Sequence, residues 1–332
     1  MRDYGPILDV IRRHDRFLLT SHLFPDGDGI GSALVLAGAL RRLGKDVRIW
    51  MPSPSPARYA FLDPAAEIRH WQSGMRGSEL ADRQVLFVLD CSAWDRLDGF
   101  GKMLEPLSLV RVCIDHHKSA SSFADVALLD VTAPATAEMV YEMMIETAGV
   151  ELDFTMAQAV YAALVTETGG FQYSNTSARV LHLAARMLEH GVSADRVNIE
   201  LNQRNPAHHI RFLARALQTL ELGAAGKMAW VAVGPDVFRE TGASAEDTVT
   251  LAGYPRSVDG VELALMFFED FPNSVKISFR SKSWLDVSEL ARQFGGGGHE
   301  RAAGALLRMP LAEAVQRVTT AGAAALAAKP EA

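Results

Sequence analysis

Acidic and histidine side chains recur in this sequence directly after short apolar runs that have the length of β-strands. They are His22, Asp26, Asp28, Asp90, Asp115, His116 and His117. Carboxylates gathered at one place raise one another's pKa, so they stay ionised only when positive charge lies among them. Imidazole and carboxylate donors without thiolate suit Mn²⁺, with Zn²⁺, Co²⁺ and Mg²⁺ as alternatives. The donors outnumber those that one ion needs, so the pattern predicts two divalent ions, an arrangement used for phosphoryl displacement.

The elements that would gather these residues are the strands of a parallel sheet. Short runs that contain several apolar residues predict strands at 16–21 and 46–51, and nearly all-apolar runs predict strands at 85–89 and 109–114. An apolar-periodic helix is expected at 31–43. Alternating strands and helices favour right-handed crossovers and a doubly wound sheet. The carboxyl ends of such strands lie at one edge, where ligands bind, so the acids and histidines are expected to meet there.

Two of these acids also allow a plainer interpretation. A single aspartate after a strand is more often a helix cap than a ligand, and Asp26 and Asp28 precede the expected helix. Gly27 and Gly29 are expected to let the backbone turn tightly around the two acids. The convergence of several strand ends favours the metal site over a set of unrelated caps.

The remainder of the chain predicts helices and then a second, smaller lobe. Helical periodicity extends over 136–222, and further strands are expected at 228–233, 261–268 and 274–279. We therefore expect an α/β fold with a catalytic domain at 1–190, a helical linker at 191–222 and a smaller α/β domain at 223–332. The first domain would hold the doubly wound, mainly parallel sheet.

A glycine run near the end of the chain is the candidate substrate-binding segment. Four consecutive glycines expose backbone N–H groups without side chains, which forms a nest for phosphate oxygens. Arginine binds phosphate through paired hydrogen bonds, and one arginine follows the run while another ends an expected strand. The predicted substrate contacts are Arg280, Ser281, Gly297, Gly298, His299 and Arg301.

Composition limits the classes of partner. The chain has 332 residues with 33 basic and 40 acidic side chains, a net charge of -7, which argues against a protein that coats long nucleic acid. No signal-like N-terminal segment and no apolar run of about 18 residues is present, so a cytoplasmic protein without membrane contact is expected. Cys91 lies among apolar residues that give no reason for a low thiol pKa, so it is not expected to act as a nucleophile.

The order and spacing of these motifs resemble the DHH phosphoesterase superfamily. The resemblance rests on His22-x3-Asp26-x-Asp28, then Asp90, then Asp115-His116-His117, and on the run GGGGHERAAG at 295–304, which is similar to the glycine-rich motif of the DHHA1 domain. In its overall length, without further domains, the chain resembles one branch of this superfamily, the nanoRNases. These are bifunctional oligoribonucleases and 3'-phosphoadenosine 5'-phosphate (pAp) phosphatases.

The resemblance implies a role for each matching residue. His22 and Asp26 would bind one metal ion, Asp28 and His116 the other, and Asp90 both. His117 would contact the scissile phosphate and Asp115 would orient its neighbours. The family's fourth motif offers an aspartate before Thr-Gly, and this chain has Glu167 there instead, so ligation through Glu167 depends on its longer side chain.

The resemblance also implies an activity. Metal-activated hydroxide would attack phosphorus in RNA of about 2–5 nucleotides and in pAp, releasing nucleoside monophosphates. The resemblance further implies that the protein forms a homodimer. The alternatives are a cyclic or linear dinucleotide phosphodiesterase, a RecJ-like single-strand exonuclease, and a nucleotide-binding regulator whose site has degenerated.

Overall fold

The computed structural model describes residues 2–117 and 123–328, and the chain forms two compact units that meet in sequence between Arg204 and Asn205. The segment expected as a linker is shared between them. Helix α7 (Ala194–Asn202) belongs to unit 1, where Val197 and Leu201 join the core. Helix α8 (Ala207–Leu217) belongs to unit 2, where Phe212 is fully buried.

Unit 1 is built on six parallel strands in the order β3-β2-β1-β4-β5-β6. The strands are β1 (Arg16–Thr20), β2 (Asp46–Met51), β3 (Ile68–His70), β4 (Val85–Leu89), β5 (Val110–Asp115) and β6 (Val126–Leu129). The parallel sheet and the four predicted strands are confirmed. The two edge strands, β3 and β6, are short and half exposed, so neither has the continuous apolar signal of the central strands.

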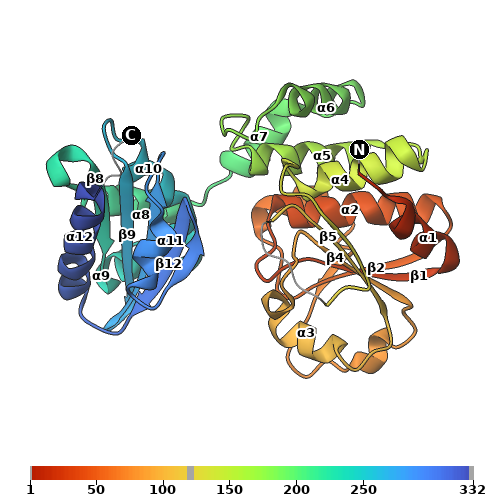
Figure 1. The fold of residues 1–332 in the computed structure, drawn as a ribbon, viewed down its shortest axis with the longest axis horizontal. Helices are drawn as coiled ribbons and strands as arrows, with labels where there is room; N and C mark the ends of the chain where they lie inside the picture. Colours follow the sequence, from red (N-terminus) through yellow and green to blue (C-terminus); the bar gives the residue numbers. More distant parts are fainter. Residues whose placement is uncertain (1, 118–122, 329–332) are drawn as a thin grey trace. The chain divides into compact units, whose positions relative to one another are not determined.

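Strand β4 is buried at every position and β1 at every position after Arg16, which explains why apolar residues dominate both. In β1, Phe17 and Leu19 enter one core while Leu18 enters another on the opposite face. Figure 1 shows the long helices on one face of the sheet and the short helix α3 (Asp98–Leu104) on the other. The long helices are α2 (Gly27–Arg42), α4 (Thr136–Tyr141, continued by a π-helical turn at Glu142–Thr147) and α5 (Phe154–Glu167). Helices α1 (Gly5–Arg13) and α6 (Ala178–Glu189) complete the unit.

Helix α2 begins four residues earlier than predicted, which changes the role of its glycines. Gly27 and Gly29 lie inside the helix and not in a tight turn, so that expectation was wrong. A Cβ at Gly29 would lie 2.3 Å from Ser21 Oγ, and one at Gly27 would lie 2.6 Å from Thr166 Oγ1. Glycine is required because the first turn of α2 packs directly against the end of β1 and the end of α5.

Unit 2 is a mixed six-stranded sheet in the order β11-β12-β10-β9-β8-β7, with cores on both faces. Its strands are β7 (Glu221–Gly223), β8 (Met228–Val233), β9 (Leu263–Phe271), β10 (Ser274–Ser281), β11 (Gly297–His299) and β12 (Ala302–Leu307). Its helices after α8 are α9 (Pro235–Thr241), α10 (Gly253–Ser257), α11 (Val287–Arg292) and α12 (Leu311–Ala327). The helix expected to reach residue 222 ends at Leu217, because the following residues pair with β8 as β7. Across 2–117 and 123–328, no helix is both long and apolar enough to cross a bilayer.

Candidate metal centre

The acid and histidine side chains meet where the strand order of unit 1 reverses. The chain proceeds from β1 outward to β3, then returns to the other side of β1 as β4. Such a reversal opens a crevice at the carboxyl ends of the two adjacent strands, where open α/β sheets bind ligands. His22 follows β1, Asp90 follows β4 and His116 follows β5, so the topology brings all three to this edge.

One group of donors surrounds the imidazole of His22. Its Nε2 lies 3.7 Å from Asp26 Oδ2 and 3.6 Å from Asp90 Oδ2. Its Nδ1 lies 2.8 Å from the carbonyl oxygen of Leu23, to which it donates a hydrogen bond. In the neutral ring that bond keeps the proton on Nδ1, so that Nε2, which lies toward the two carboxylates, would be available to bind a metal ion.

A second group surrounds the imidazole of His116. Its Nε2 lies 3.4 Å from Asp90 Oδ1, 3.7 Å from Asp28 Oδ2 and 3.8 Å from Glu167 Oε2. Its Nδ1 donates to the carbonyl oxygen of Ala133 at 3.2 Å, so Nε2 again faces the acids. Glu167 is the last residue of α5, and its side chain, which is longer than that of aspartate, therefore reaches the cluster.

Asp90 connects the two groups. Its Oδ2 faces His22 and its Oδ1 faces His116, so each oxygen belongs to a different set of donors. The residue is fully buried and adopts a left-handed backbone with φ 57°. This conformation is tolerated by Asp and Asn better than by other side chains, and strain of this kind is concentrated at functional sites.

Thr136 supports Asp90 and was not anticipated from the sequence. Its hydroxyl donates to Asp90 Oδ1 at 3.1 Å, and the residue is fully buried at the start of α4. A threonine that opens a helix normally suggests a cap, and nothing in the local pattern points to a residue 46 positions away.

The two acids of the first motif cap helices and also face the histidines. Asp26 Oδ1 accepts hydrogen bonds from the N–H groups of Asp28 and Gly29, so it caps α2, while its Oδ2 faces His22. Asp28 accepts from the backbone N–H groups of Thr136 and Ala137, at 2.6 and 2.9 Å, so it caps α4. Each of these two side chains can therefore cap a helix and also bind a metal ion. Asp26 would use a different oxygen for each role, and Asp28 a different lone pair.

Asp115 holds His117. Its Oδ1 accepts hydrogen bonds from His117 N at 3.1 Å and from His117 Nδ1 at 2.7 Å. The same ring nitrogen lies 3.4 Å from Asp90 Oδ1. His117 is therefore oriented at the edge of the cluster. Burial raises the pKa of Asp115, but the hydrogen bond that it accepts from His117 and the charge of His117 outweigh burial and lower it.

Crowding changes the protonation of the acids. Burial raises the pKa of Asp28 to about 7, and the charge of Asp90 acts in the same direction. Burial raises the pKa of Glu167 to about 9, with further contributions from the neighbouring carboxylates. For Asp90, burial raises the pKa, but its contacts with His116 and His22 outweigh burial and lower it.

The histidines show the complementary effect. Burial lowers the pKa of His22, but its contacts with Asp26 and Asp90 outweigh burial and raise the pKa to about 10. The same opposition raises the pKa of His116 to about 10. The raised pKa values of His22, His116, Asp28 and Glu167 share one cause, the negative charge of the carboxylates gathered around them.

The residues present fit divalent cations. Among the described residues, Asp90 Oδ2 and His116 Nε2 are buried atoms without a hydrogen-bond partner. Buried polar atoms are normally paired, and two such atoms in a cluster of carboxylates and imidazoles indicate a missing positive partner. Oxygen and imidazole donors suit Mn²⁺, Zn²⁺ and related ions. Cys91 stands apart from this set, since burial raises its thiol pKa to about 11.

The predicted substrate contacts lie together in unit 2, around the edge formed by β10, β11 and β12. Arg280 pairs in register with Ala302, and the turn at 300–301 joins β11 to β12. A Cβ at Gly298 would lie 2.5 Å from the carbonyl oxygen of Ala302, so glycine is required there by close packing. Nothing lies within 4 Å of a Cβ built at Gly297, so packing does not require glycine there, and Gly297 pairs in register with Gly304.

These residues differ in what they can offer a ligand. Ser281 is 1% exposed and its hydroxyl donates to the carbonyl of Glu300, so it stabilises the turn. Arg301 donates to the carbonyl of Leu285 at 3.0 Å and pairs with Glu300, and His299 is exposed. The hydrogen bonds of Arg280 go to backbone carbonyls, and within the part of the chain that the structure describes no carboxylate pairs with it.

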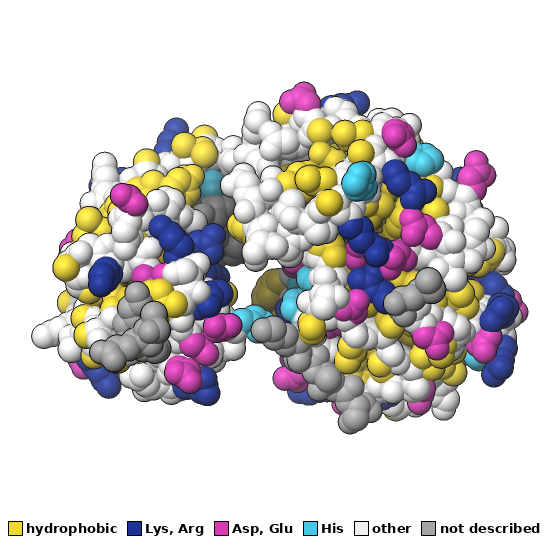
Figure 2. All heavy atoms as spheres, turned by 45° about the horizontal axis from the view of Figure 1, so that its top comes forward, with side chains coloured by type: hydrophobic (Ala, Val, Ile, Leu, Met, Phe, Trp, Pro, Cys, Tyr) yellow, Lys and Arg dark blue, Asp and Glu magenta, His cyan; other side chains and the backbone are white. Residues whose placement is uncertain are grey.

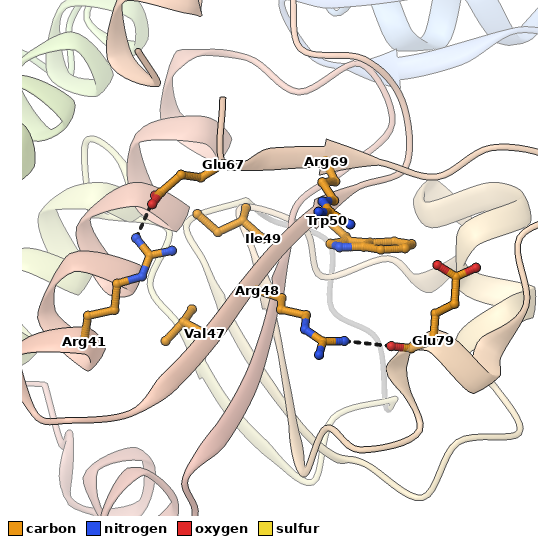
Figure 3. Close-up of a pocket in the computed structure, with 8 residues that line it drawn as sticks. All are labelled: Arg41, Val47, Arg48, Ile49, Trp50, Glu67, Arg69 and Glu79. Atoms are coloured by element: carbon orange, nitrogen blue, oxygen red, sulfur yellow. Dashed lines mark hydrogen bonds and ion pairs between the residues drawn. The ribbon is translucent and has the colours of Figure 1, made fainter. Parts of the chain in front are cut away.

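A cavity of about 450 Å³ in unit 1 contains none of the predicted site residues. Figure 3 shows Arg41 paired with Glu67, and Arg48 donating to the backbone carbonyl of Glu79. The remaining lining residues are Val47, Ile49, Trp50 and Arg69. Two of its three arginines are thus engaged in contacts along the β2–β3 edge of the sheet.

Comparison with known proteins identifies both units. The N-terminal domain model of the DHH family matches residues 16–164, and the DHHA1 domain model matches residues 227–326. A bifunctional oligoribonuclease and PAP phosphatase NrnA from Thermus thermophilus is 30% identical over 91% of this chain and 88% of its own length. A protein of the same name from Bacillus subtilis is 26% identical over 90% of this chain and 91% of its own length.

Solved structures share the fold. The crystal structure of an exopolyphosphatase-related protein from Bacteroides fragilis superposes with a TM-score of 0.88 at 22% identity, covering 96% of this chain and 94% of that one. RecJ from Thermus thermophilus, solved in complex with Mn²⁺, superposes with a TM-score of 0.57 at 14% identity, covering 99% of this chain and 55% of that one. The resemblance inferred from the motifs is confirmed, and the chain belongs to the DHH family, with a DHH domain followed by a DHHA1 domain.

Proposed function

We propose that this protein is a divalent-metal phosphoesterase that hydrolyses RNA of about 2–5 nucleotides to nucleoside monophosphates and removes phosphate from pAp. The observation that carries the proposal is the position of Asp90, whose two oxygens face two separate histidines at 3.6 and 3.4 Å. A carboxylate shared in this way is suited to a pair of ions. The names of the two NrnA relatives supply the substrate classes.

The proposed metal ligands follow the two groups of donors. His22 and Asp26 would hold one ion, Asp28, His116 and Glu167 the other, and Asp90 both. The donor set favours Mn²⁺. When bound, the ions would neutralise charge on the phosphate oxygens and make hydroxide available near neutral pH. The reach of Glu167 to His116 counts against a degenerate, non-enzymatic site.

Other residues of unit 1 would position the substrate. His117 is held by Asp115, and we assign it to a hydrogen bond with the scissile phosphate or the leaving oxygen. Such a bond stabilises charge that grows in the transition state. Thr136 holds Asp90, and the helix caps made by Asp26 and Asp28 hold their own carboxylates in place.

Unit 2 would bind a second phosphate or the sugar-phosphate backbone. Burial and the nearby charge of Arg256 lower the pKa of Arg280, and among the described residues its hydrogen bonds go to backbone carbonyls and not to a carboxylate. A phosphate would supply the missing counter-charge. Gly297 and Gly298 carry no side chains, so a phosphate would be able to approach the backbone of this segment.

The charge distribution supports short substrates. On the face drawn in Figure 2, basic and acidic side chains are intermingled. The chain as a whole carries more acidic than basic residues, 40 against 33. A protein that binds long single strands needs a continuous basic groove, since affinity depends on the number of phosphates neutralised.

Substrate length is the direct test of the proposed function. With Mn²⁺, we expect kcat/KM for a two-nucleotide RNA to exceed that for a 24-nucleotide RNA by about 10-fold or more, since a small site gains little from a long chain. Rates are measured by chromatography of the released monophosphates, with pAp and a cyclic dinucleotide in parallel. Faster turnover of the long strand would indicate a RecJ-like exonuclease instead, and faster turnover of the cyclic substrate a cyclic dinucleotide phosphodiesterase.

The hydroxyl of Thr136 gives a prediction for a supporting residue. Thr136→Val keeps the shape of the side chain but removes the hydrogen bond to Asp90, so kcat/KM for the dinucleotide should fall about 10-fold, as for other groups that orient metal ligands. Thr136→Ser keeps the hydroxyl and should retain most of the activity. Equal activity of the two variants would show that the hydrogen bond from Thr136 to Asp90 does not contribute to catalysis.

A further inference from the structure

Phe24 lies between two of the proposed metal ligands and is unusually exposed. It is 68% exposed, and no other described large apolar side chain of unit 1 is more exposed. Only one residue separates it from His22 and one from Asp26. Two Cα–Cα steps place its Cα within about 7.6 Å of the Cα atoms of both. An aromatic ring therefore stands in solvent at the border of the metal centre.

The backbone at Phe24 is strained and held. Its φ is 56°, a left-handed conformation that a bulky residue rarely adopts. The N–H of Phe24 donates to Ser53 Oγ at 2.8 Å, and the N–H of Leu23 donates to the carbonyl of Arg96 at 2.8 Å. Two neighbouring loops thus fix this segment in a conformation that is unfavourable for Phe and that leaves its ring out of the core.

Strain and exposure at one position call for a functional explanation. A strained backbone conformation persists only where its surroundings hold it in place, as they do at Phe24, and such conformations are concentrated at functional sites. A phenyl ring offers an apolar π face and no hydrogen bond. In a short nucleotide substrate, the group with a matching flat face is the base.

We propose that Phe24 is a stacking platform for a nucleobase next to the phosphate that is cleaved. The proposal rests on the proposed function, because it assumes that the ligand of the metal centre is a nucleotide. The platform explains how a site that recognises phosphate through ions would distinguish nucleotides from other phosphate esters. Since stacking tolerates every base, it would not select one sequence.

The decisive variant is Phe24→Asn. Asparagine tolerates the left-handed backbone better than phenylalanine, so folding should be preserved while the ring is lost. We expect the KM for a two-nucleotide RNA to rise about 10-fold, within the range found for loss of one stacked base, with a smaller change in kcat. Phe24→Tyr and Phe24→Trp keep a π face and should retain the wild-type KM.

Phe271 provides a matched control. It is also 68% exposed, but it lies at the end of β9 in unit 2 and follows none of the metal motifs. Phe271→Asn removes the same ring from an equally exposed position and should leave the KM unchanged. A wild-type KM for Phe24→Asn, or an equal rise for Phe271→Asn, would overturn the proposal.

Binding of the product separates this proposal from the proposed function. In the full chain with Mn²⁺, calorimetry should show AMP binding about 10-fold more tightly than ribose 5-phosphate, and Phe24→Asn should remove most of that difference. An equal loss for both ligands would mean that the ring does not contact the base. If the wild type cleaves neither short RNA nor pAp, the proposed function fails, while the comparison of AMP with ribose 5-phosphate still decides the role of Phe24.

Discussion

Asp90→Asn is expected to lower kcat/KM for a two-nucleotide RNA by about 10³-fold, equivalent to about 4 kcal/mol of transition-state stabilisation. The reason is that the two oxygens of Asp90 face the two different groups of donors. Asparagine keeps the shape and tolerates the left-handed backbone at this position, whereas alanine would add strain. Loss of activity in Asp90→Asn therefore reports the missing negative oxygen.

The control for this variant is an exposed aspartate five residues further along the chain. Asp95→Asn changes the same side chain at a surface position and should retain wild-type activity. Without added metal, Asp90→Asn should unfold at a lower temperature than the wild type, because contacts with His22 and His116 lower the pKa of Asp90 and its charge therefore stabilises the folded state. Activity within a few-fold of wild type would refute the role of Asp90 in both donor groups.

Removal of metal ions has the second large expected effect. Chelation with EDTA should reduce hydrolysis of short RNA to background, and Mn²⁺ should restore it, because the proposed reaction depends on hydroxide activated by metal ions. Restored ions should also stabilise the fold. At a free concentration of about 100 times Kd, binding contributes about 2.7 kcal/mol, which raises Tm by roughly 5–10 °C for a unit of this size.

The rise in Tm distinguishes the proposed site from metal bound elsewhere. Asp90→Asn should lose most of the increase, whereas Asp95→Asn should show all of it. Differential scanning calorimetry of the full chain, with and without Mn²⁺, measures both. Hydrolysis that persists in EDTA, together with an unchanged Tm on addition of Mn²⁺, would contradict a metal-dependent mechanism.

Local sequence patterns were sufficient for the central sheet and for most of the candidate site. Strands β1, β4 and β5 are largely buried, so each appears as a mainly apolar run, and the residues that follow each run lie at the carboxyl edge of the sheet. That relation holds for His22, Asp90 and His116. It explains why their convergence was predictable without knowledge of the strand order.

Contacts between distant residues were decided by tertiary packing. Asp28 caps a helix that begins 108 residues later, and Thr136 holds an aspartate 46 residues before it. The sequence predicted Asp28 as a possible cap of its own helix, because local periodicity describes only near neighbours. The same limit explains the misjudged glycines, whose close contacts come from β1 and α5.

The sequence by itself determined the kinds of donor, their positions at strand ends and the family to which the chain belongs. These features depend on residue type and on short-range periodicity, both of which a single chain displays directly. Only the tertiary structure decided that the oxygens of Asp90 face different histidines, that Glu167 reaches His116 and that the ring of Phe24 stays in solvent. Those features depend on how separate elements pack, which no local pattern encodes.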